Sequence, residues 1–186
     1  MSFDLTGSLL ISTPAMGDPR FARSVTYLCA HGPDGAFGLV LNRPLPRLRL
    51  QKVLDQLGIP LGEAPGTAPV LAGGPVETQR GFVLHTGLAG HDDGQALPGG
   101  LVLSASLDIL RAVARGEGPT RWLLALGYAG WGPGQLEAEI TQNAWLTSAA
   151  SEALIFDPIP GEHQWNDALR AMGIDPLSLS AVAGRA

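Results

Sequence analysis

The sequence predicts an α+β protein in which a largely antiparallel sheet is flanked by several helices within a single domain, residues 1–186. Strand-like segments outnumber helix-like ones, and the clearest pairing is a tight hairpin of residues 24–31 and 36–43. The turn between these strands, Gly32-Pro33-Asp34-Gly35, has residue types that favour tight turns. Hydrophobic residues make up 45% of the chain and charged residues 16%, a composition typical of one packed core.

Both hairpin strands are apolar on both faces, as the alternation of Tyr27 and Cys29 with Leu28 and Ala30 illustrates. We therefore expect central strands that are covered on two sides. The other strand-like segments are short and less regular. They are residues 7–13, 70–72, 81–85, 101–104, 122–128 and 153–156.

Helices are predicted where apolar residues recur at positions i, i+3, i+4 and i+7 and a glycine then follows in the left-handed stop position. The glycine- and proline-rich residues 60–69 and 86–100 are expected to form surface loops instead. The predicted helices are residues 50–57, a helix that Ser106 caps and Gly116 ends, residues 165–172, and a short helix that starts at Pro176.

Four groups of motifs resemble the recurring signatures of the YqgE/AlgH family. They are Leu9-Leu10-Ile11-Ser12-Thr13-Pro14 with residues 18–21 and 38–44, residues 72–76 with 80–85, residues 127–137, and Asn143-Ala144-Trp145-Leu146. The resemblance covers nearly the whole chain. It implies an α+β fold with a curved, mainly antiparallel sheet, but no defined reaction. Some family members are labelled transcriptional regulators, which implies an effect on gene expression and not direct contact with DNA.

Arginine and histidine side chains are expected near strand ends at the rim of the sheet. We expect Arg80 and His85 there, and with Arg20 and Arg43 they could bind a carboxylate or another small anion, because guanidinium groups match such groups in bidentate fashion. The alternative is that each arginine holds a loop in place through a backbone carbonyl or a carboxylate.

The loop of residues 130–134 follows a predicted strand and precedes an apparent helix. It is not expected to bind a dinucleotide, because it lacks the third glycine of G-x-G-x-x-G and Pro133 removes one N–H donor. A tight turn that orients Trp131 is favoured. Trp131 could also be an exposed anchor for a protein partner, together with Gln135 and Glu137.

Cys29 and His31 lie two residues apart on a predicted strand, so their side chains should share one face. Cys29 could therefore be a reactive thiol. Its apolar neighbours favour the alternative of a small core residue. No metal or other cofactor is expected, because four scattered histidines and one cysteine do not form a ligand set.

The formal net charge of −5 and a pI near 5.2 disfavour binding to nucleic acid. Arg43, Arg47, Arg49 and Lys52 are the local basic cluster, and four charges are few for such a site. No uninterrupted apolar run is long enough for a transmembrane helix. The acidic start at Asp4 and the single cysteine favour a bacterial cytoplasmic protein.

The sequence thus favours a non-enzymatic binding or regulatory protein that engages a protein or small anionic ligand. The binding surface would be formed by Arg20, Arg43, Arg80, His85, Trp131, Gln135 and Glu137. Two alternatives remain open: a hydrolase or transferase that uses His85 and Glu137, and a direct transcriptional regulator that uses residues 43–52.

Overall fold

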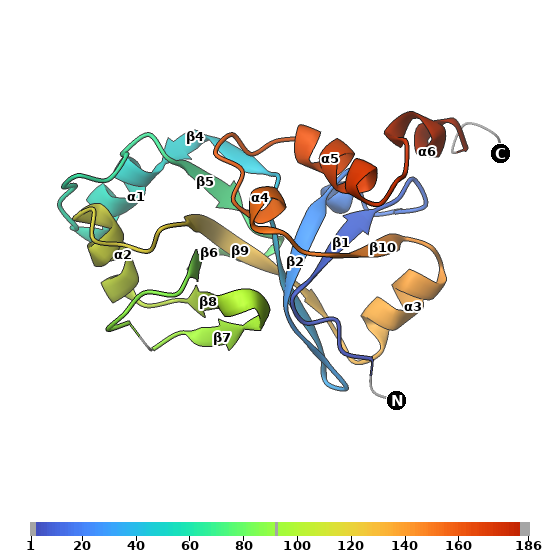
Figure 1. Cartoon of the computed structure of the whole chain (residues 1–186), viewed down its shortest axis with the longest axis horizontal. Coiled ribbons are helices and arrows are strands. Elements are labelled where there is room, and N and C mark those ends of the chain that lie inside the picture. The colour runs from blue at the N-terminus through green and yellow to red at the C-terminus, as the bar shows by residue number, and fades with distance from the viewer. Residues whose placement is uncertain (1–2, 92, 183–186) are drawn as a thin grey trace.

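The computed structural model describes residues 3–91 and 93–182 (Figure 1). Within this part of the chain, ten strands form one curled sheet, and the prediction of an α+β fold with a curved, mainly antiparallel sheet is confirmed. The strands are β1 (Ser8–Ser12), β2 (Val25–Gly32), β3 (Gly35–Val40), β4 (Pro44–Arg49), β5 (Pro69–Ala72), β6 (Val76–Thr86), β7 (Gln95–Leu97), β8 (Leu101–Ser104), β9 (Trp122–Trp131) and β10 (Trp145–Ala149).

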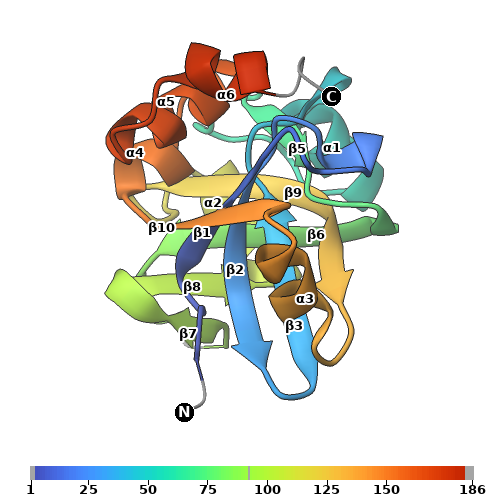
Figure 2. The ribbon, with the colours of Figure 1, turned by 90° about the vertical axis from the view of Figure 1, so that its right-hand side faces the viewer.

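The strand order is β10-β1-β2-β3-β9-β6-β8-β7, with neighbours antiparallel throughout. Strand β9 links the two halves of the sheet. Its C-terminal end pairs with β3, its N-terminal half pairs in parallel with β5, and β6 runs along its other edge. Strand β4 pairs only with β5. The sheet curls because the long strand β9 takes part in both halves of the sheet (Figure 2).

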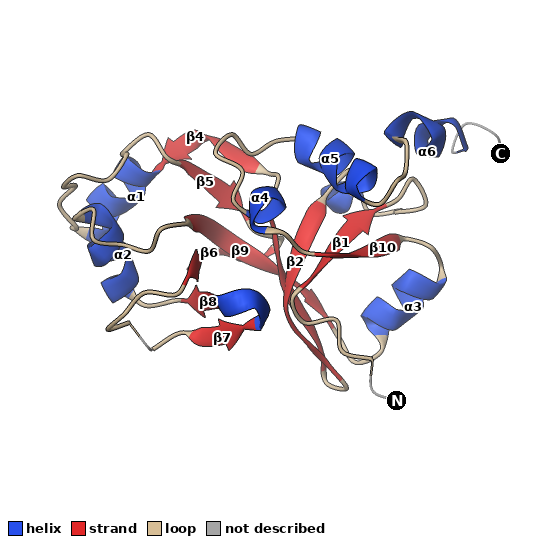
Figure 3. Ribbon diagram, viewed as in Figure 1, coloured by secondary structure: helices blue, strands red, loops and turns tan. Residues whose placement is uncertain are grey.

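The helices cover different parts of the sheet (Figure 3). They are α1 (Leu50–Leu57), α2 (Leu107–Ala114), α3 (Gln135–Thr141), α4 (Glu152–Ile155), α5 (His163–Ala171) and α6 (Pro176–Val182). Helices α1 and α2 lie at the end of the sheet that contains β5, α3 follows β9, and α4, α5 and α6 follow β10. Among the described residues, no helix is long and apolar enough to span a membrane.

Three clusters of buried side chains form the core. Tyr27 and Cys29 of β2 pack with Trp165 of α5 in the first cluster, whereas Leu28 packs with Leu136 of α3 in another. The remaining cluster lies beneath α1 and α2. The predicted burial of β2 on both faces is therefore confirmed, because each face has its own helical cover.

Two of the signature motifs meet where the β5–β6 connection crosses β9. The N–H of Gly73 donates to the carbonyl of Leu126 over 2.8 Å, and the carbonyl of Gly73 accepts from Val40 over 2.8 Å. Gly127 has a φ of +78°, and a Cβ there would lie 2.5 Å from the carbonyl oxygen of Gly74. Only glycine fits such a close crossing of two backbones.

Several predicted elements differ from the structure. Of residues 153–156, which were predicted as a strand, residues 153–155 belong to α4 and Phe156 is its C-cap, because Ser151 Oγ accepts from the N–H of Leu154 over 3.3 Å and begins a helical turn. Strand β10 was not predicted, and β7 lies inside the predicted loop 86–100. Strand β4 was not predicted either, because its two prolines disfavour a strand. Ser106 occupies the N-cap of α2, but its hydroxyl makes no capping bond.

Candidate binding pocket

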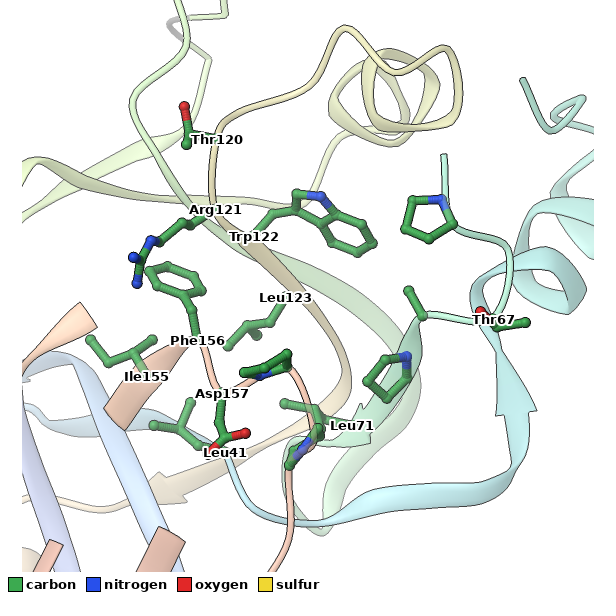
Figure 4. A pocket seen from close by; sticks show the side chains of 15 residues that line it. Leu41, Thr67, Leu71, Thr120, Arg121, Trp122, Leu123, Ile155, Phe156 and Asp157 are labelled. Carbon is green, nitrogen blue, oxygen red and sulfur yellow. The ribbon is translucent and has the colours of Figure 1, made fainter. Parts of the chain in front are cut away.

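A pocket of about 580 Å³ lies where three distant segments of the chain meet (Figure 4). One wall comes from the loop before β5, one from the start of β9, and one from the end of α4 and the residues after it. In Figure 4, Trp122 and Leu71 lie on opposite sides of the pocket, and Thr67 faces Phe156 across it. The lining residues are Leu41, Pro65, Thr67, Ala68, Pro69, Leu71, Thr120, Arg121, Trp122, Leu123, Ile155, Phe156, Asp157, Pro158 and Pro160.

Most of the pocket surface is apolar. The floor of the pocket is formed by Leu41, Leu71 and Leu123, which are buried members of the first core cluster. Trp122 and Phe156 are only partly buried, so their rings remain accessible. Four prolines complete the walls and contribute carbonyls but no N–H donors. Such a surface favours the apolar part of a ligand.

The first turn of α5 fixes the wall formed by residues 155–160. Gln164 is buried, its Nε2 donates to the carbonyl of Leu154 over 3.1 Å, and its Oε1 accepts from the N–H of Gly161 over 2.9 Å. Asp157 accepts from the N–H of Ile159 over 2.9 Å, and its other carboxylate oxygen lies 2.7 Å from Nε2 of His163. These bonds hold the wall in place without a ligand.

Arg121 and Asp157 are the charged side chains that line this pocket in the described part of the chain. Their surroundings differ. Asp157 is largely covered and has hydrogen bonds to both oxygens. Arg121 is 48% exposed, and its Nε lies 3.5 Å from Oε2 of Glu152, which is 50% exposed. The arginine is therefore the charge that is more accessible to a ligand.

Trp122 differs from the other three tryptophans. Trp131 and Trp145 both donate their indole N–H to Glu139, and Trp165 donates to the carbonyl of Ser12. Within residues 3–91 and 93–182, the Trp122 indole donates to no acceptor. An indole N–H usually finds a partner when it is buried, so this donor is left to solvent or to a ligand.

None of the seven residues predicted to form a binding surface lines this pocket. The structure brings Trp131 and Gln135 together around Glu139 of α3. Glu139 Oε2 accepts from Trp131 over 3.0 Å and from Trp145 over 2.7 Å, while its Oε1 accepts from Gln135 over 3.0 Å. Trp131 is buried and packs against Phe21 and Trp145, so it is not the exposed anchor that the sequence suggested.

Glu137 lies on the same helix but has another partner. The N–H of Leu5 donates to His31 Nδ1 over 3.1 Å, so Nε2 carries the ring proton and donates to Glu137 Oε1 over 2.9 Å. Hydrogen bonds from its own backbone N–H and from His31 lower the pKa of Glu137. The carboxylate therefore stays ionised and joins α3 to the end of β2.

The three arginines predicted to form the binding surface each contact a different partner. Arg20 forms a bidentate pair with Asp18, and Arg43 donates to the carbonyl of Ala22. Arg80 lies within β6 rather than at its end; it pairs with Glu77 over 3.3 Å and its guanidinium lies 5.1 Å from the Phe82 ring centre. It lines a separate hollow of about 330 Å³.

His85 is fully buried near the end of β6, and both ring nitrogens have partners. Nδ1 donates to the carbonyl of Thr86 over 2.7 Å, and Nε2 accepts from the Ser104 hydroxyl over 2.8 Å. Burial lowers the pKa of His85 below its ordinary value. The imidazole is therefore neutral and joins β6 to β8. Glu137 bonds to His31 instead, so the pair suggested for catalysis has no shared hydrogen bond.

Cys29 is fully buried in the first core cluster. The register of β2 against β3 shifts between Leu28 and Ala30, so Cys29 is the extra residue of a bulge. His31 therefore contacts α3, whereas Cys29 faces the opposite cluster, and the expected pairing on one face is wrong. Burial raises the pKa of the thiol to about 12, which disfavours the thiolate. No group of metal-binding side chains occurs among the described residues.

The pocket could not be predicted from the sequence, because its lining residues carry no motif. Thr67 and Pro69 fall in the predicted loop of residues 60–69, and residues 153–156 were predicted as a strand. A weak signal was present in the two pairs of prolines, Pro65 with Pro69 and Pro158 with Pro160, but Trp122 is far from both pairs in the chain. That signal has a meaning only when the three segments are brought together.

The fold and site define a curled α+β domain with an apolar pocket beside its central strand. The family described as AlgH-like matches residues 9–177, and the chain belongs to this family. It is 51% identical to a UPF0301 protein of Cereibacter sphaeroides and 52% identical to one of Ruegeria pomeroyi, each over 98% of this chain and all of the relative. The predicted resemblance is thereby confirmed.

Two solved structures have the same fold. The solution structure of the AlgH protein from Pseudomonas aeruginosa is 45% identical, with a TM-score of 0.79 over 96% of this chain and 94% of that protein. A crystal structure of a Corynebacterium diphtheriae protein is 23% identical, with a TM-score of 0.74 over 96% of this chain and 91% of that protein. The second likeness concerns the fold alone.

Proposed function

We propose that this protein is a non-enzymatic binding protein, and that its ligand occupies the pocket between β9 and the end of α4. The observation that carries the proposal is the combination of an apolar floor with two accessible donors, the exposed Arg121 guanidinium and the Trp122 indole N–H, which has no acceptor in residues 3–91 and 93–182. Pockets of about 300–1,000 Å³ with this composition are the usual sites of small ligands. A volume of about 580 Å³ falls within that range.

The contacts of the pocket favour binding over catalysis. Catalysis of hydrolysis or group transfer needs a base with an accessible lone pair, either to act on water or to activate a hydroxyl nucleophile. Asp157 is already engaged by His163 and by the N–H of Ile159, and His85 is buried at another site with both nitrogens bonded. Any effect on gene expression would then be indirect, through occupancy of the pocket and a partner protein.

The proposal is tested by NMR titration of the ¹⁵N-labelled protein with a library of small apolar acids, amides and amines. The expected result is that bound compounds shift the amide signals of residues 120–123 and 155–157 together. A Thr67→Trp variant should abolish these shifts, because the new ring fills the pocket. The matched control is Thr141→Trp on the exposed face of α3. Shifts confined to other regions, or binding that survives Thr67→Trp, would exclude the pocket.

A further inference from the structure

The two charges of the pocket differ in how firmly they are held. Asp157 has a hydrogen bond on each carboxylate oxygen and is only 21% exposed, so a ligand cation would have to compete with His163 and with a backbone N–H. Arg121 makes one long contact with Glu152. Exposed ion pairs of this kind contribute little to stability, so an anion can readily replace Glu152.

The backbone of Arg121 is nevertheless fixed. Its N–H donates to the Thr86 hydroxyl over 3.2 Å, and its carbonyl accepts from the Thr86 N–H over 2.9 Å. The side chain of Arg121 therefore extends from a fixed backbone position at the beginning of β9. Its planar group has several donors that could meet a carboxylate in bidentate fashion.

The other polar side chains of the pocket also act as donors. Thr67, Thr120 and Trp122 carry an O–H or N–H with no acceptor in residues 3–91 and 93–182. They line the same pocket as Arg121. The side chains available to a ligand are therefore one guanidinium, one indole N–H and two hydroxyl groups, which can also accept. Because the guanidinium is the accessible charge among them, this set favours an anionic ligand that accepts hydrogen bonds.

On the basis of the proposed function, we infer that the pocket binds a small carboxylic acid with an apolar, preferably aromatic, body. The carboxylate pairs with Arg121, and the body lies against Phe156, Leu123 and Trp122. A single guanidinium with neutral donors suits one carboxylate better than a multiply charged phosphate, which proteins usually surround with several cations or backbone N–H groups.

The test compares three probes of similar shape by the same NMR titration: phenylacetate, the neutral phenylacetamide and the cation phenethylammonium. We expect phenylacetate to bind at least about tenfold more tightly than phenylacetamide, because hydrogen bonds to charged groups are the stronger ones. Phenethylammonium should bind most weakly. All three should shift the same signals of residues 120–123 and 155–157.

Two variants locate the effect at Arg121. Arg121→Gln should lower the affinity for phenylacetate to that for phenylacetamide and leave phenylacetamide unchanged. Glu152→Gln should strengthen phenylacetate binding, because it removes the carboxylate that competes for Arg121. Arg111→Gln is the matched control, since Arg111 forms a similarly exposed pair with Asp108 and does not line this pocket.

The outcomes separate the inference from the proposed function. Equal affinities for the acid and the amide, or no effect of Arg121→Gln, would overturn the carboxylate inference while the pocket still binds its probes. If no probe shifts the pocket signals, both fail. Acetyl-triglycyl-phenylalanine tests the remaining source of a carboxylate. Much tighter binding of this peptide than of phenylacetate would overturn a small-molecule ligand in favour of a peptide C-terminus.

Discussion

At the scale of single residues, Glu139 holds together the aromatic cluster at the end of β9. It accepts from the indoles of Trp131 and Trp145, whose ring centres lie 6.0 Å apart, and from the Gln135 side chain. Trp122 has the same side chain, but its indole has no such acceptor in the part of the chain that the structure describes, and it lines the pocket. The partners of a residue, more than its type, therefore decide its role.

We predict that Glu139→Ala lowers the free energy of unfolding by about 2 kcal/mol or more, because each largely buried donor left unpaired costs about 1–3 kcal/mol. Urea denaturation followed by tryptophan fluorescence measures the change. The control is Glu117→Ala, which removes an exposed pair with Arg115 and should cost no more than about 1 kcal/mol. Similar losses in both variants would show that the indole bonds contribute little.

A second residue-scale prediction concerns alkaline pH. Burial raises the pKa of Cys29 from 9.0 to about 12 and that of Tyr27 from 10.0 to about 12. The unfolded chain then loses these protons at lower pH than the folded chain. The free energy of unfolding should therefore be unaffected by these groups below about pH 9 and fall as the pH rises from there toward 12.

Urea denaturation between pH 8 and 11 checks this expectation. Cys29→Ala removes one of the two groups, so the variant should start less stable but lose stability less steeply with pH. Identical slopes for the two proteins would contradict the assigned role of the thiol. In the native protein, Cys29 should also react slowly with thiol reagents until the chain is unfolded.

Among the secondary-structure elements, the local sequence pattern was sufficient to predict those whose backbone hydrogen bonds form within the element itself. The helix α1 begins and ends within the predicted residues 50–57, because its apolar spacing and Gly58 are local signals. The strands β4 and β10 were not predicted, since their hydrogen bonds come from distant strands. The short helix α4 was misassigned, because four apolar-rich residues fit either period.

The crossing at Gly127 provides the prediction at this scale. Gly127 and Gly99 have nearly the same φ, +78° and +77°, but a Cβ at Gly99 would meet nothing within 4 Å. Gly99→Ala should therefore cost about 1–2 kcal/mol for the left-handed backbone alone. Gly127→Ala should cost several kcal/mol more or prevent folding, because the methyl group would collide with the Gly74 carbonyl.

Thermal and urea unfolding of the two alanine variants measure this difference under the same conditions. Equal losses would mean that the β5–β6 connection moves away from β9 at little cost. The comparison separates the effect of the backbone dihedral from that of the close approach, since the two sites have nearly the same φ and a Cβ would meet a backbone carbonyl only at Gly127.

At the scale of the whole molecule, the pocket exists because β9 joins the two halves of the sheet. The loop before β5 and the end of α4 belong to different halves, and the start of β9 lies between them (Figure 1). Each segment is stabilised by its own contacts, Gln164 for one wall and the β5–β9 pairing for another. The pocket is thus a property of the assembled sheet.

The negative net charge of the molecule disfavours binding to DNA. With a net charge of −5, the purified protein should show no salt-sensitive binding to duplex DNA, because such binding requires the neutralisation of several phosphates. Fluorescence anisotropy at low and raised salt tests this. Sequence-specific binding that weakens with salt and is lost in Arg47→Gln and Arg49→Gln would instead support a direct regulator acting through residues 43–52.

The family, the α+β class, the central hairpin and the principal helices could be predicted from the amino-acid order alone, because they depend on motifs, apolar period and turn residues that lie close together in the chain. Tertiary structure decided which polar side chains were already engaged. His85 and Trp131 became parts of the packed interior, Cys29 became the extra residue of a bulge, and Arg121 came to line a pocket. The reason is physical: a side chain is available for binding only when no neighbour from a distant segment has already satisfied it, and those neighbours are set by the folded chain.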